Sequence, residues 1–172
     1  MAGQFFRIIA VMKVTGFSFI KNAEKFHYPI AEALRSILPL CDEIVVAVGD
    51  SEDGTRELVL SVDRKIRVID TVWDNTLKGG GKVLAVETDK AFAAIDKETD
   101  WCIYIQGDEV MHEDGHTAVK EAMYKWKDDP SVDGLLFKYR HFFGSYDYVG
   151  NESGWYRVIR PLTVLKISCS FL

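Results

Sequence analysis

Residues 101–110 have the sequence WCIYIQGDEV, an apolar run that stops at Gln106, Gly107, Asp108 and Glu109. Aromatic and β-branched residues followed by a glycine are typical of a buried strand and its end. Open α/β sheets bind ligands beyond the carboxyl ends of their strands, where carboxylates can hold a cation or a diphosphate–metal complex. We therefore expect a binding site at the tip of this strand.

The rest of the chain alternates between strand and helix patterns. We expect strands at residues 5–20 (one strand, or two broken near Thr15 and Gly16), 44–48, 66–69 and 134–139, and helices at 30–38, 56–62, 82–95 and about 118–126. The helices show apolar residues at helical spacing, and IVVAV at 44–48 is the continuous β-branched run of a strand covered on both faces. This alternation predicts a parallel sheet with right-handed crossovers.

Length and composition favour one cytoplasmic α/β domain. The chain has 172 residues, 48% of them apolar, and a formal net charge of −5 with lysine and arginine scattered, so we expect no nucleic-acid partner. Cys41, Cys102 and Cys169 are odd in number and lack CxxC spacing, which favours reduced thiols, two of them in the core. No stretch has a signal-peptide pattern or membrane-spanning length; peripheral association with the inner face of a membrane stays open.

The loop GDSEDGT at residues 49–55 follows the strand at 44–48. A carboxylate there can accept hydrogen bonds from a base N–H or from ribose hydroxyls. Asp50 and Asp53 are the candidates. We favour ligand contact for Asp50, and for Asp53 we favour capping of the next helix, because acidic residues are common before helices.

The glycine run Gly79–Gly81 precedes a helical pattern that starts at Lys82. It is not a Walker motif, because Thr76 occupies the first glycine position and Val83 replaces the metal-binding hydroxyl residue. Backbone N–H groups at such a turn, together with Lys82, can contact a phosphate. A plain flexible connection is equally consistent with the pattern.

Residues 112–116, HEDGH, match the HExxH pattern of zinc peptidases. That mechanism requires one stable helix across all five residues, so that His112 and His116 bind zinc on the same face. Asp114 and Gly115 are poor residues for a helix interior. We therefore favour a polar loop that leads into the next helix, and rank a zinc hydrolase last.

Four segments carry a family resemblance: GFSFIKNAEKF with the following helix and RSILPLCDEIVVAVGDSEDGTREL, then KGGGKVLAVETDKAF, WCIYIQGDEV, and SGWYRVIRP. Together they span most of residues 16–161, and they resemble glycosyltransferase family two. The resemblance implies the GT-A nucleotide-diphospho-sugar transferase fold, a three-layer α/β/α, Rossmann-like arrangement with a mainly parallel sheet. We expect residues 1–172 to form one such domain, short of part of the usual C-terminal acceptor region.

The resemblance also implies roles for individual residues. QGDE stands where the family has its DxD-type motif, so Asp108 and Glu109 would hold Mg²⁺ or Mn²⁺ against the donor diphosphate. Gln106 replaces the first Asp that many members carry, and Val48 and Gly49 replace the usual acidic residues after the second strand. The donor-binding residues implied are Asn22, Asp50, Asp53, Lys82, Gln106 and Asp108.

The C-terminal third supplies the candidates for acceptor chemistry. Asp147 and Glu152 are the candidate bases. The aromatic and basic group Tyr139, Arg140, His141, Phe142, Phe143 and Trp155 can line an acceptor pocket, although we favour a core position for it. The tail PLTVLKISCSFL departs from the family's usual continuation, which indicates a shortened product or an apolar end hidden in a homo-oligomer interface.

The sequence therefore predicts a metal-dependent glycosyltransferase. It would move a sugar from a nucleotide-diphospho-sugar to a hydroxyl of a sugar or lipid-linked acceptor, with inversion, in cell-surface polysaccharide synthesis. The alternative is a catalytically incomplete module that binds a nucleotide-sugar, which Gln106 and the short C-terminal region favour.

Overall fold

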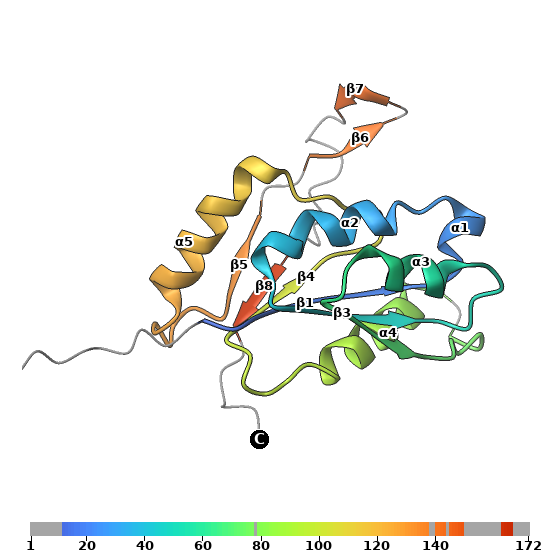
Figure 1. Ribbon diagram of the computed structural model, residues 1–172, viewed down its shortest axis with the longest axis horizontal. Coiled ribbons are helices and arrows are strands. Elements are labelled where there is room, and N and C mark those ends of the chain that lie inside the picture. Colours follow the sequence, from blue (N-terminus) through green and yellow to red (C-terminus); the bar gives the residue numbers. More distant parts are fainter. Residues whose placement is uncertain (1–11, 78, 138–139, 144, 150–162, 167–172) are drawn as a thin grey trace, which may run out of the picture.

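The computed structural model describes residues 12–77, 79–137, 140–143, 145–149 and 163–166. Its main sheet has the strand order β3-β2-β1-β4-β8-β5, and helices cover both faces (Figure 1). The strands are β1 Val14–Ile20, β2 Glu43–Val48, β3 Ile66–Asp70, β4 Trp101–Tyr104, β5 Gly134–Leu136, β6 Phe142–Phe143, β7 Ser145–Val149 and β8 Thr163–Lys166. The helices are α1 Ala23–Phe26, α2 Ile30–Ile37, α3 Thr55–Val62, α4 Lys82–Ala93 and α5 His116–Trp126, with short 3₁₀ turns η1 Leu38–Leu40 and η2 Glu113–Gly115.

The parallel part of the sheet has a reversal in its strand order. β1 pairs in parallel with β2 on one side and with β4 on the other, and β2 pairs in parallel with β3. The chain thus builds β1, β2 and β3 in one direction and then crosses back to place β4 beside β1. All four strands end at one edge of the sheet, and a reversal of this kind is where α/β proteins bind their ligands.

Two apolar layers hold the helices against the sheet. One face of the sheet packs against α2, α3 and α5 and includes Leu34, Ile44 and Trp101 among its buried side chains. The other face packs against α4 and includes Phe17 and Val45. The predicted three-layer α/β arrangement with a mainly parallel sheet is confirmed, and Figure 1 shows α4 alone on its side of the sheet.

Strand β1 runs unbroken through Thr15 and Gly16, so the alternative of a break near these residues is wrong, while residues 5–11 of the expected strand lie outside the described residues. Gly16 suits the strand because a Cβ there would lie 2.8 Å from Cδ1 of Ile37 and 3.1 Å from Sγ of Cys41. Helix α2 therefore packs directly on the backbone of the central strand.

The C-terminal strand differs from the expected parallel pattern. β8 is antiparallel to both β4 and β5 and lies between them. Residues 163–166 of the apolar tail thus form a strand inside the sheet. No oligomer interface is needed to account for this part of the tail. Periodicity indicates that a segment forms a strand, but it does not indicate the neighbour or the direction.

The aromatic run at residues 139–143 does not join the core where the structure describes it. β6 and β7 form a hairpin that projects from the body (Figure 1). Phe142 is 42% exposed, and Arg140 and His141 are exposed. The predicted core position is therefore wrong for these three residues, while Tyr139, Trp155 and the side chain of Phe143 lie outside what the structure describes.

Cys41 and Cys102 are buried free thiols, as predicted. Burial raises the pKa of each thiol to about 12, so both are protonated at neutral pH. Cys169 lies outside the described residues. Among the residues that the structure describes, no helix is long and apolar enough to cross a membrane.

Candidate functional site

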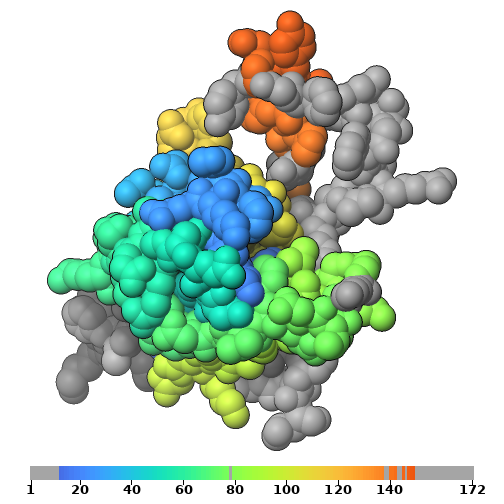
Figure 2. All heavy atoms as spheres, turned by 90° about the vertical axis from the view of Figure 1, so that its right-hand side faces the viewer, coloured from blue at the N-terminus to red at the C-terminus, as the bar shows by residue number. Residues whose placement is uncertain are grey.

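The carboxyl ends of β1 to β4 are followed by four loops that meet at one edge of the sheet. Figure 2 views the molecule from this edge, where the segments that follow β1, β2 and β3 crowd together. A hollow of about 380 Å³ lies beside the end of β2, and its walls include Asp50, Asp53, Arg56, Asp70 and Thr71. The site is therefore polar and mainly acidic on the β2–β3 side.

The loops after β1 and β2 are joined by hydrogen bonds between backbone N–H groups and side-chain oxygens. Asn22 is 7% exposed and has left-handed backbone angles (φ 52°), which asparagine tolerates better than most residues. Its side-chain Oδ1 accepts a hydrogen bond from the N–H of Glu52 at 2.8 Å, and its own N–H donates to Oγ of Ser51 at 3.0 Å. Asn22 thus holds the second loop in place through its buried amide.

Asp53 also has an internal role. Its carboxylate accepts from the N–H of Lys25 at 2.8 Å and from the N–H of Thr55, the first residue of α3, at 3.1 Å. One oxygen of Asp53 therefore binds α1 and the other binds the start of α3. The N-cap residue of α3 is Gly54, so the predicted capping position is off by one residue, although Asp53 does bond to the first N–H of the helix.

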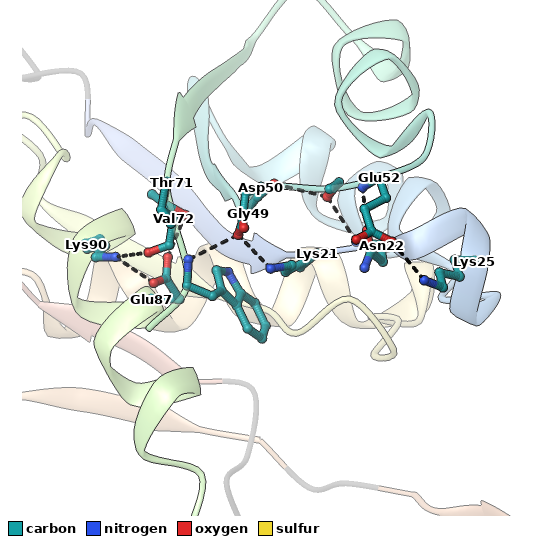
Figure 3. A network of polar contacts seen from close by, with 12 residues as sticks. Lys21, Asn22, Lys25, Gly49, Asp50, Glu52, Thr71, Val72, Glu87 and Lys90 are labelled. Carbon is teal, nitrogen blue, oxygen red and sulfur yellow. Dashed lines mark hydrogen bonds and ion pairs between the residues drawn. The ribbon is translucent and has the colours of Figure 1, made fainter. Parts of the chain in front are cut away.

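Asp50 is the carboxylate that β2 presents at its end. Its Oδ1 accepts from Nζ of Lys21 at 2.6 Å and from the N–H of Trp73 at 3.1 Å (Figure 3). The hydrogen bond from Lys21, followed by that from Trp73, holds the pKa of Asp50 below its usual value. The side chain is 44% exposed, and both of these hydrogen bonds end on Oδ1 and not on Oδ2.

Trp73 covers the end of β2. Its indole lies against Gly49, and Nζ of Lys21 lies 5.7 Å from the ring centroid. The ring of Phe19, from the α4 face of the sheet, is 6.1 Å away. Sequence analysis missed Trp73; the available signal was Gly49, since a glycine at a strand end often marks a close approach of other atoms.

Glu87 on α4 is a second residue that sequence analysis missed. It is fully buried, its Oε2 accepts from Oγ1 of Thr71 at 2.6 Å, and its Oε1 accepts from Nζ of Lys90 at 2.6 Å (Figure 3). Lys90 also donates to the carbonyl oxygen of Val72 at 3.2 Å. The available signal was spacing, because Glu87 lies four residues before the buried Ala91 and so shares its helix face.

The tip of β4 is a tight turn over residues 106–109. Oε2 of Glu109 accepts from the N–H of Gln106 at 3.0 Å, and the Glu109 N–H donates to the Gln106 carbonyl at 3.2 Å. Burial, and to a lesser extent the charge of Asp108, raises the pKa of Glu109. Asp108 itself is exposed, so it is the carboxylate of this motif that faces solvent.

The residues at the strand tips offer few ligands for the divalent cation that the resemblance implies. Within the described part of the chain, no group of three or more His, Cys, Asp and Glu residues is arranged to hold a metal. Mg²⁺ commonly uses one or two carboxylates together with substrate phosphates, so Asp108 fits a cation that arrives with a diphosphate. The Gln106 N–H bonds to Oε2 of Glu109, so Oε1 is the oxygen through which Glu109 would serve as a second ligand.

Gly79, Gly80 and Gly81 all have left-handed backbone angles, with φ of 86°, 64° and 70°. This explains three consecutive glycines, because other residues adopt this conformation only with strain. Lys82 begins α4 as predicted, with an exposed side chain. Its contact with a phosphate stays a prediction.

The zinc interpretation of residues 112–116 is wrong. His112 lies before η2, and its Nδ1 accepts from the N–H of Asp114 at 3.3 Å. His116 begins α5, and its Nε2 is 2.7 Å from the carbonyl oxygen of Ser36. The required helix across both histidines is absent from this described segment, and the preferred polar loop is confirmed.

Neither candidate base is seen at the carboxyl edge of the sheet among the described residues. Asp147 lies on the β6–β7 hairpin, which Figures 1 and 2 show standing apart from the loops at the carboxyl edge. Its N–H donates to Oγ of Ser145 at 3.2 Å. Glu152 lies outside the described residues. Both assignments stay predictions.

Solved structures of nucleotide-sugar glycosyltransferases share this fold. S. aureus TarS 1–349 in complex with UDP-GlcNAc matches with a TM-score of 0.60 and 20% identity, over 91% of this chain and 46% of that one. Mannosyltransferase PcManGT from Pyrobaculum calidifontis, with GDP-Man and Mn²⁺, matches with a TM-score of 0.54 and 19% identity, over 74% of this chain and 36% of that one. Glucosyl-3-phosphoglycerate synthase from Mycobacterium tuberculosis, with UDP, matches with a TM-score of 0.52 and 19% identity, over 77% and 46%.

These likenesses define a GT-A glycosyltransferase fold for the chain. The chain spans less than half the length of these three proteins. No protein-family model matches the sequence, and no curated protein matches it either.

Proposed function

We propose that this chain is a GT-A domain that binds a nucleotide-diphospho-sugar and transfers the sugar to a hydroxyl of a sugar or lipid-linked acceptor. The observation that carries the proposal is the position of Asp50 and Asp108. They follow β2 and β4, the two strands that flank β1 at the reversal of strand order. Two strand spacings separate these tips by roughly 10 Å, so one extended ligand can reach both.

Each end of the ligand has a chemical counterpart. Oδ2 of Asp50 accepts from a base N–H or a ribose hydroxyl, and Asn22 and Asp53 hold the loops beside it. Asp108 is the ligand for a divalent cation, which neutralises charge on the departing nucleoside diphosphate. Gln106 borders the same tip, and Lys82 at the start of α4 contacts a phosphate.

Transfer to a hydroxyl also needs a base. In the proposed reaction, Asp147 or Glu152 takes the proton from the acceptor hydroxyl as its oxygen attacks the anomeric carbon and the bond to the diphosphate breaks. One displacement inverts the configuration at that carbon. We place the reaction in cell-surface polysaccharide synthesis, at the inner face of the membrane.

A second candidate is a nucleotide-sugar binding module without catalysis. Two observations favour it: Gln106 supplies no charge at the first motif position, and Glu109 is bonded to the backbone of its own turn. Such a module would bind the donor but would not transfer the sugar.

The test is calorimetric titration with UDP-, GDP-, CMP- and dTDP-linked sugars, with and without Mn²⁺. We expect one nucleotide class to bind more tightly with Mn²⁺, and Asp108→Ala to remove the metal dependence. Asp128→Ala, an exposed carboxylate beyond α5, is the matched control and should bind as the wild type does. Absence of binding to every compound would contradict the proposal, and binding without transfer to added acceptors would favour the binding module.

A further inference from the structure

The buried Glu87 needs an explanation beyond stability. Its side chain is 0% exposed, whereas its partner Lys90 is 39% exposed. Ionised groups are costly to bury, and apolar replacements of buried ion pairs are often neutral or stabilising. The role of Glu87 therefore lies in the groups to which its carboxylate is hydrogen-bonded.

Glu87 and Lys90 together hold one short segment, residues 71–73. Glu87 accepts from the Thr71 hydroxyl, and Lys90 donates to the Val72 carbonyl. The Thr71 N–H donates to the Val48 carbonyl at 2.8 Å, which aligns this segment with the end of β2. Side chains on α4 thus fix the backbone immediately before Trp73.

Trp73 connects that segment to the candidate donor site. Its N–H donates to Oδ1 of Asp50, and its indole covers Gly49. A continuous series of contacts therefore runs from Glu87 through residues 71–73 to Asp50, and Figure 3 shows it. A shift of the segment would remove one of the two hydrogen bonds that fix Oδ1.

We propose that Thr71 and Glu87 are positioning residues that hold the Trp73 N–H against Asp50 and so fix the carboxylate that contacts the donor. This inference rests on the proposed function for the role of Asp50. The Thr71 hydroxyl and the Glu87 carboxylate bond to protein groups, so neither has to contact the ligand. Their contribution is preorganisation, since a carboxylate already held in place loses less freedom on binding.

The first experiment needs no donor. Hydrogen exchange of the Trp73 amide, followed by NMR, is measured in the wild type, Thr71→Val, Thr71→Ser and Thr88→Val. We expect Thr71→Val to exchange about 10-fold faster, as loss of roughly one hydrogen bond implies. Thr71→Ser keeps a hydroxyl and should behave as the wild type does. Thr88→Val is the matched control, because the Thr88 hydroxyl bonds to Leu84 and Tyr104 and not to the segment.

The second experiment first measures the affinity of the wild type for UDP and for GDP in the presence of Mn²⁺. The variants are then compared with the nucleotide that binds more tightly. Thr71→Val and Glu87→Gln should each weaken binding by about 5- to 10-fold, the effect of one hydrogen bond. Asp89→Asn, an exposed neighbour on α4, should have no effect. In an Asp50→Ala background Thr71→Val should cause no further loss, because the group through which Thr71 acts is gone.

The two experiments separate the two proposals. Unchanged Trp73 exchange in Thr71→Val, or a full additional loss of affinity in the Asp50→Ala background, overturns the positioning role. Faster Trp73 exchange in a protein that binds none of the UDP-, GDP-, CMP- and dTDP-linked sugars supports the positioning contact and contradicts the proposed function. Unfolding temperatures of all variants, with Thr71→Ser as the rescue, exclude a general loss of structure as the cause.

Discussion

The indole of Trp73 lies so close to the Cα of Gly49 that a Cβ built there would be 2.4 Å from Nε1 and 2.6 Å from Cδ1. This spacing, and no special backbone angle, explains the glycine after β2. The packing brings the β3–α4 connection over the end of β2. The acidic loop at residues 49–55 and Trp73 are therefore packed against each other.

Gly49→Ala should destabilise the protein by about 1–3 kcal/mol, the usual cost of overpacking, because the rigid indole must move. Urea unfolding followed by circular dichroism measures this change. Gly115→Ala is the control, since no heavy atom lies within 4 Å of a Cβ at that position and the backbone is right-handed. Equal stability of Gly49→Ala and the wild type would show that the indole does not pack there in solution.

Asn22→Ala should cost about 1–3 kcal/mol, because the N–H of Glu52 loses its acceptor in a partly buried hydrogen bond and alanine must adopt a left-handed conformation. Asn22→Gly loses the same hydrogen bond but tolerates the backbone angles. We therefore expect the glycine variant to be the more stable of the two in chemical unfolding. The reverse order would argue against the left-handed conformation at this position.

The positions of Asp50 and Asp108 could be predicted from the sequence, because each follows an apolar run that forms a parallel strand. The helices α2, α3, α4 and α5 could be predicted from periodicity, with α4 ending at Ala93 and not at residue 95. These features are local, and local patterns determine them.

The contacts that connect the site could not be predicted in the same way. Trp73 meets Asp50 across 23 residues, and Thr71 meets Glu87 across 16. Partners at such distances depend on how the loops pack after the sheet has formed. The antiparallel position of β8 is missed for the same reason, since its partner β4 lies far back in the chain.

Glu109 should make stability depend on pH in a particular direction. Its pKa is raised in the folded protein, mainly by burial, so the folded state holds the proton more tightly than the unfolded state does. The contribution of Glu109 to stability should therefore fall as pH rises through the range that begins near the ordinary glutamate pKa of about 4.3. Glu109→Gln keeps an acceptor for the Gln106 N–H but does not titrate.

The measurement is the stability of Glu109→Gln minus that of the wild type, by urea unfolding from pH 3.5 to 7. This difference should increase as pH rises and then level off. Asp96→Asn should show the opposite sign, because backbone and Lys13 hydrogen bonds lower the pKa of Asp96 in the folded state. A difference for Glu109→Gln that declines with pH would contradict burial of its carboxylate.

His116 should act as a structural link between α5 and α2, with no metal involved. Its Nε2 lies 2.7 Å from the Ser36 carbonyl oxygen, and a carbonyl only accepts, so this nitrogen carries the hydrogen. The Ser36 hydroxyl accepts from the N–H of Met111 at 3.0 Å, so Ser36 holds residues 111–116 at both ends.

His116→Ala should therefore cost about 1 kcal/mol, the net value of one hydrogen bond. Lys120→Ala, at an exposed position on the same helix, is the control, because His112→Ala would itself remove the hydrogen bond from the Asp114 N–H. EDTA should leave the unfolding midpoint unchanged, whereas a zinc site would lose much of its folding free energy with the metal.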